Sequence, residues 1–119
     1  MLQLLSKVKI IDNSGGKKGR VIKILNNKKI GKIGDLVLVS ILKNQPSSKI
    51  RKGTIHMGII VRTKVRSNRN PYNIVWSDNA IALVKKQKNN IIPIGSRIKG
   101  PISSIIDSEK VLGISKRKL

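Results

Sequence analysis

The chain has 119 residues, with 26 Lys and Arg against 5 Asp and Glu, so its net charge is +21. A compact domain with so many like charges repels itself, so a polyanion is the expected partner and nucleic acid is the leading candidate. Apolar residues make up 39% of the chain and recur along all of it, which argues against a disordered basic tail and predicts one domain over residues 1–119. The absence of Cys excludes disulfides, thiolate metal ligands and thiol nucleophiles.

The N-terminal apolar run is short. Leu2, Leu4 and Leu5 are interrupted by Gln3 and followed by Ser6, which is too few apolar residues for a signal peptide or a membrane span. We therefore expect a soluble, unprocessed protein with no membrane partner.

Short segments rich in Ile and Val alternate with clusters of turn residues about every 8 to 12 residues, which is typical of a small all-β barrel or sandwich. They predict strands at residues 7–11, 20–25, 36–42, 55–63, 74–76 and 80–84. The turns at residues 12–16, 31–35, 44–48 and 67–71 are short, which favours antiparallel neighbours and leaves no room for crossover helices. After Pro101, a Ser cap, early Asp107 and Glu109 and a later Lys110 predict one or two helical turns.

The inventory for catalysis is poor, because five carboxylates, one His and no Cys offer few proton-transfer or nucleophilic groups. His56 has no second His or carboxylate nearby and is expected to be a solvent-side or RNA-side strand residue. Asp12, Asp35 and Asp78 each stand beside Gly or Asn at a strand end and are expected to fix turns. No phosphate-loop or dinucleotide motif occurs, so we expect no enzyme, no metal, no cofactor and no small-molecule substrate. A small hydrolase remains a distant alternative.

Residues 16–19 read Gly-Lys-Lys-Gly, the pattern of the backbone-clamping loop of KH domains. In that fold the loop joins helices, whereas here strands are predicted on both sides. We expect instead a basic glycine turn whose Lys17 and Lys18 contact phosphate.

Basic residues gather in five clusters on the predicted loops, with almost no acidic compensation. The clusters are Lys28, Lys29 and Lys32; Lys49, Arg51 and Lys52; Arg62, Lys64, Arg66 and Arg69; Lys85, Lys86 and Lys88; and Arg97 and Lys99. The only aromatic residues are Tyr72 and Trp76, and Trp76 is expected in the core, so a platform for stacking unpaired bases is missing. This favours recognition of folded RNA through phosphate, sugar and shape.

Seven stretches occur in an order and spacing that argue against chance: Ile-Asp-Asn-Ser-Gly at 11–15, Gly-Asp at 34–35, Lys-Gly at 52–53, Val-Arg-Thr-Lys at 61–64, Asp-Asn-Ala at 78–80, Pro-Ile-Gly-Ser-Arg-Ile-Lys-Gly-Pro at 93–101 and Ser-Glu-Lys at 108–110. Over essentially its whole length, the chain resembles the universal large-subunit ribosomal protein family number fourteen, of bacterial and organellar type.

The resemblance implies a small closed five-stranded β-barrel with a projecting basic hairpin and one or two short C-terminal helices. It also implies a structural, non-enzymatic protein that binds large-subunit rRNA at the subunit interface and forms bridges to small-subunit rRNA. The protein partners implied are large-subunit ribosomal proteins three and nineteen and a ribosome silencing factor. The resemblance and the basic clusters together predict RNA contacts at Asn13, Ser14, Lys17, Lys18, Lys28, Lys29, Lys49, Arg51, Lys52, Arg62, Lys64, Arg66, Arg69, Arg97 and Lys99.

The chain departs from the family pattern in three places. Residues 70–73 replace the usual Asp-Gly turn of the hairpin, Lys99 stands where an aromatic residue is common, and residues 116–118 form a basic tail. These changes leave open what contacts the hairpin and the tail and whether silencing-factor binding is retained. A free basic RNA-binding barrel that acts as an RNA chaperone or regulator is the alternative function.

Ile, Lys and Asn make up 50 of the 119 residues and Ala only 2, a bias typical of AT-rich coding genomes. With no presequence visible, this bias favours an organelle-encoded protein of the mitochondrial ribosome. A plastid or the cytoplasm of an AT-rich bacterium is the alternative.

Overall fold

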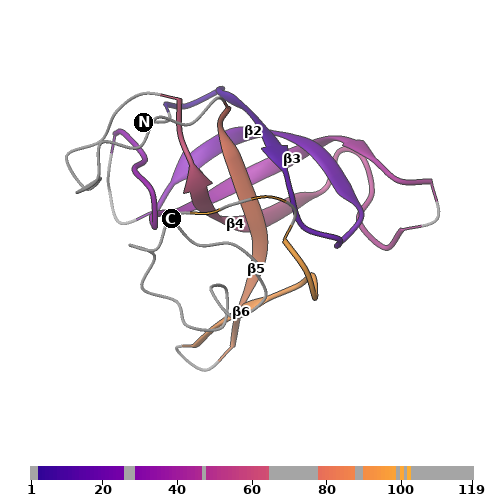
Figure 1. Cartoon of the computed structure of the whole chain (residues 1–119). Coiled ribbons are helices and arrows are strands. Elements are labelled where there is room, and N and C mark those ends of the chain that lie inside the picture. The colour runs from indigo at the N-terminus through magenta and orange to yellow at the C-terminus, as the bar shows by residue number, and fades with distance from the viewer. Residues whose placement is uncertain are drawn as a thin grey trace.

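The computed structural model describes residues 3–25, 29–46, 48–64, 78–87, 90–98, 100 and 102. Six strands occur in this part of the chain (Figure 1). They are β1 (Lys7–Ile10), β2 (Gly16–Ile24), β3 (Leu36–Asn44), β4 (Ile55–Arg62), β5 (Ala80–Gln87) and β6 (Asn90–Pro93).

The first five strands form a closed barrel. Each strand from β1 to β5 pairs antiparallel with the next, and β1 also pairs with β5, with Lys9 opposite Ala80 and Ile10 opposite Ile81. This closing pair is parallel, which corrects the expectation of antiparallel neighbours only. The reason is geometric: strand direction reverses at each step of a meander, so the first and fifth strands run the same way. The three strands between them form the long connection that a crossover helix forms between parallel strands of an open sheet.

The aliphatic residues of the strands fill the barrel. On β3 the burial alternates, with Val37, Val39 and Ile41 pointing inward. On β5, residues 80–84 are all buried, which means that both faces of this strand are covered. Ile98 and Ile102 belong to the same core, at 4% and 0% exposure.

The strand predictions at 7–11, 20–25, 36–42, 55–63 and 80–84 are confirmed with shifted ends, and the mainly β barrel is confirmed with them. β6 was not predicted, because its four residues end in Pro93 and Pro in a short run argues against a strand. It pairs with the far end of β5 and forms a hairpin below the barrel in the view of Figure 1. The predicted strand at 74–76, the basic hairpin and the C-terminal helices lie outside the described residues.

In the described ranges, no helix is long and apolar enough to cross a membrane.

Candidate nucleic-acid interface

Basic side chains are distributed over the outside of the barrel. Of the predicted RNA contacts, Lys28, Arg66, Arg69 and Lys99 lie outside the described residues. The exposed basic residues within the described part are Lys7, Lys9, Lys17, Lys18, Lys23, Lys29, Lys43, Lys49, Arg51, Lys52, Lys64, Lys85, Lys86 and Arg97.

The carboxylates that the structure describes are turned into the protein. Asp12 and Asp35 are 5% and 8% exposed, and the Asp78 side chain is 17% exposed. Asp35 Oδ2 accepts a hydrogen bond from Lys32 N–H at 2.8 Å, which confirms its predicted role in a turn. The described surface therefore presents many exposed cations and no exposed carboxylate, so its charge is even more one-sided than the composition indicates.

Asp12 holds two parts of the fold together. Its Oδ1 accepts hydrogen bonds from Ser14 N–H at 3.3 Å and from Ser14 Oγ–H at 2.6 Å, which confirms the predicted turn. Its Oδ2 accepts the buried Leu83 N–H of β5 at 2.9 Å, a contact across 71 positions of sequence. Asp12 thus fixes the loop after β1 against the middle of β5.

Burial raises the pKa of Asp12 above its ordinary value of 3.8, although the hydrogen bonds from Ser14 and Leu83 act the other way. A raised folded-state pKa means that the Asp12 contribution to the free energy of unfolding is complete below pH 3.8 and is lost as pH rises through the folded-state pKa. Urea unfolding of the wild type and of Asp12→Asn at a series of pH values measures this contribution. The stability difference, wild type minus variant, is expected to fall as pH rises from this acidic range to neutrality; a rise would contradict the assignment.

Asn13 ties the loop after β1 to the loop after β6. Its Oδ1 accepts hydrogen bonds from Ser96 N–H at 2.7 Å and Arg97 N–H at 3.1 Å, and its Nδ2 donates to Ser96 Oγ at 2.9 Å. A Cβ at Gly95 would lie 2.7 Å from Asn13 Oδ1, so the glycine allows this close approach. The side chain of Asn13 is therefore already engaged within the protein, and its predicted contact with RNA stays a prediction.

The same two loops and the loop after β3 enclose a shallow cavity of about 290 Å³. Ser14, Lys49 and Ser96 are among the residues that line it. Ser14 Oγ donates to Asp12, as described above, whereas Lys49 is exposed. Three predicted contacts, Asn13 and Ser14 from one part of the sequence and Lys49 from another, are thus brought together here.

Lys17 and Lys18 lie within β2, which corrects the expected glycine turn at 16–19. Register shifts at Lys18 break the strand alternation, so both lysines are exposed while Gly16 and Gly19 face inward. A Cβ at Gly16 would lie 2.8 Å from Ile10 Cδ1. The glycines therefore permit close packing inside the barrel, and the bulge is what turns both lysines outward.

Asp78 lies where β1, β4 and β5 meet and forms ion pairs, and its expected role in a turn stays a prediction. Its Oδ1 lies 3.2 Å from Arg62 Nε, and its Oδ2 lies 3.6 Å from Lys9 Nζ. The Arg62 pair lacks hydrogen-bond alignment, and the Arg62 side chain is only 13% exposed. Arg62 is thus held by a carboxylate inside the fold, and its predicted contact with RNA stays a prediction.

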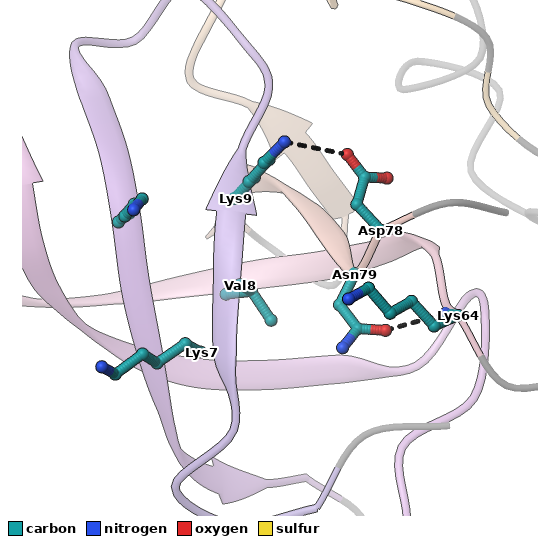
Figure 2. A pocket seen from close by; sticks show the side chains of 7 residues that line it. Lys7, Val8, Lys9, Lys64, Asp78 and Asn79 are labelled. Carbon is teal, nitrogen blue, oxygen red and sulfur yellow. Dashed lines mark hydrogen bonds and ion pairs between the residues drawn. The ribbon is translucent and has the colours of Figure 1, made fainter.

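Beside Asp78, a cavity of about 200 Å³ opens along β1; we name it the seam cavity because it adjoins the β1–β5 pair that closes the barrel (Figure 2). Four lysines from three parts of the chain line it: Lys7 and Lys9 of β1, Lys18 of β2, and Lys64 just after β4. Lys18 and Lys64 were predicted contacts, whereas Lys7 and Lys9 were missed. The alternation Lys-Val-Lys-Ile in β1 was the available signal, because it places both lysines on one face.

The comparison with known families covers nearly the whole chain. A family model described as ribosomal protein L14p/L23e matches residues 1–117. The chain belongs to this family. It is therefore a structural constituent of the large ribosomal subunit that works in translation on the ribosome, and the resemblance noted from its sequence is confirmed.

The structure brings together stretches that carried the L14p/L23e resemblance from opposite ends of the sequence. Asp12 forms an isolated antiparallel bridge with Ile98, and Asn13 N–H donates to Arg97 O at 3.1 Å. The departures from the family pattern at 70–73, Lys99 and 116–118 lie outside the described residues.

Proposed function

We propose that this L14p/L23e protein binds large-subunit rRNA mainly through backbone phosphates. The observation that carries the proposal is the sign of the surface charge. Exposed lysines and arginines occur on β1, β2, β3 and β5 and on the loops between strands, while Asp12, Asp35 and Asp78 are turned inward. A surface whose exposed charges are all positive attracts the RNA backbone, and contacts with phosphate do not distinguish one base sequence from another. Such a protein suits a fixed place among folded RNA segments.

Within the ribosome, we place the protein at the face of the large subunit that meets the small subunit, where it contributes bridges to small-subunit rRNA. Ribosomal proteins three and nineteen are its proposed neighbours, and a ribosome silencing factor is a further proposed partner. These assignments rest on the family resemblance. The exposed cations on several sides of the barrel support them, because a protein between two RNA surfaces needs contacts on more than one side.

Sedimentation tests the proposal against a free RNA chaperone or regulator. Ribosomes are washed at high salt and separated on a gradient, and the protein is detected in the fractions. We expect it to remain with large subunits, because release from an assembled subunit requires all contacts to a folded site to break together, and this slows dissociation even where salt weakens each contact. Recovery mainly at the top of the gradient, with large subunits otherwise intact, would favour the chaperone.

We propose the mitochondrial ribosome as its location and an organellar gene as its source. The support is the bias toward Ile, Lys and Asn, with Ala nearly absent. Sequencing of DNA from purified mitochondria tests this directly. The gene is expected there; its presence only in plastid or bacterial DNA would replace the assignment.

A further inference from the structure

The seam cavity combines four cations with one acid. The cavity is lined by Lys7 and Lys9 of β1, Lys18 of β2 and Lys64 just after β4, and Asp78 is the acid. Like charges around a concave surface raise the local potential more than the same charges spread over a convex surface. The cavity is therefore a site where an anion is favoured over water.

Of the two ion pairs of Asp78, the one with Lys9 is the weaker. The Lys9 side chain is 61% exposed and its Nζ lies 3.6 Å from Asp78 Oδ2, so solvent screens this pair. The Arg62 side chain is 13% exposed, with its Nε at 3.2 Å from Asp78 Oδ1, so it is screened far less. Figure 2 shows the Lys9 side chain pointing toward Asp78, with the ion pair drawn as a dashed line.

The opposite side of the cavity is fixed by the backbone. Lys64 N–H donates to Asn79 Oδ1 at 2.8 Å, and Lys9 N–H donates to Asn79 O at 3.0 Å. Asn79 thus holds the segment of Lys64 at a set position relative to β1. The cavity volume of about 200 Å³ is several times the share of one water in the liquid, about 30 Å³, and leaves room for a phosphodiester group.

We propose that the seam cavity binds one phosphate of the RNA backbone, and that Lys9 leaves Asp78 for this phosphate while Arg62 keeps Asp78. The inference rests on the proposed function and adds a specific site to it. Asp78 acts here as a positioning residue: in the free protein it holds Lys9 beside the cavity, and in the complex its remaining charge is balanced by Arg62.

The cavity is tested first without rRNA. A ¹⁵N-labelled sample of the full chain is titrated with inorganic phosphate and, in parallel, with sodium chloride at equal ionic strength. We expect saturable shifts that phosphate alone causes, centred on the amides of Val8, Lys64 and Asn79. Shifts of similar size across the whole basic surface, without saturation, would overturn the site.

The second test uses rRNA and two variants that each remove two charges. Lys9→Met/Lys64→Met changes opposite sides of the cavity, and Lys85→Met/Lys86→Met is the matched control on the part of β5 that pairs with β6. Relative to the control, the cavity variant is expected to bind large-subunit rRNA about tenfold more weakly per lost contact, with an unchanged melting temperature.

The outcomes separate the two proposals. Equal losses in the cavity and control variants, without saturable shifts by phosphate, would overturn the cavity site and leave rRNA binding intact. Saturation by inorganic phosphate together with equal losses would mean a site for free anions, which overturns the assignment to RNA. Absence of rRNA binding by the wild type would contradict the proposed function. The phosphate titration would then still show whether the cavity binds an anion.

Discussion

The affinity of the protein for large-subunit rRNA is expected to fall by about four decades when salt is raised from about 50 to about 200 mM. If about eight of the 26 basic residues, roughly a third, meet phosphates, log affinity falls with log salt at a slope of roughly −6 to −7. The inward-turned carboxylates support this steep dependence, because no exposed carboxylate of the described residues competes for the surface cations.

Filter binding or fluorescence anisotropy with a large-subunit rRNA fragment, over a series of salt concentrations, measures the slope. Replacement of the exposed Lys64 by Ala should reduce its magnitude by roughly one unit, since one phosphate contact is lost. Arg62→Ala gives a contrast, because Arg62 is paired with Asp78 and its loss should first lower stability. A wild-type slope shallower than about −3 would mean that phosphate contacts do not dominate the affinity.

Gly15→Ala is expected to lower the free energy of unfolding by about 3 kcal/mol. Gly15 has a φ of +113°, which an L side chain rarely adopts, and a Cβ there would lie 2.2 Å from Ser48 Cβ. Ser48 cannot move aside freely, because its Oγ donates to Gln45 O and Ile50 O. The backbone strain contributes about 1–2 kcal/mol and the overlap about 1–3 kcal/mol.

Gly53→Ala is the matched control for this prediction. Gly53 also has a positive φ, +86°, but a Cβ there meets nothing within 4 Å. It should therefore cost only the backbone strain, about 1 kcal/mol. Chemical denaturation of both variants separates the two causes. Equal losses of stability would show that contact with Ser48 is relieved without cost.

The barrel itself could be predicted from local patterns. The run Leu-Val-Leu-Val-Ser-Ile-Leu at residues 36–42 predicts a strand because β-branched residues suit a pleated sheet and turn residues flank the run. Local patterns did not predict the features that depend on how strands pair with one another. The bulge at Lys18 depends on how β2 meets β3, and β6 forms because the far end of β5 offers a free edge to a short segment that ends in Pro93.

For the candidate interface, the sequence predicted the local role of a residue better than its partners in the folded protein. The sequence correctly indicated that Asp12 fixes a turn, because Asp before Asn and Ser commonly bonds the following backbone. Its bond to Leu83 N–H spans 71 positions, and no local pattern contains such a contact. The same limit applies to Asp78, whose partners Lys9 and Arg62 come from two other strands.

By itself, the sequence determined that this is a folded β protein with a large excess of cations and that it resembles a ribosomal protein family, since composition, spacing and short motifs are local properties. The same excess of cations is the reason to expect nucleic-acid phosphate as the ligand. Only the tertiary structure decided how the charges are arranged. It turned the described carboxylates inward and gathered Lys7, Lys9, Lys18 and Lys64 around one cavity. The physical reason is barrel closure: pairing β1 with β5 joins segments about 70 positions apart, and register between such segments is set by the whole sheet.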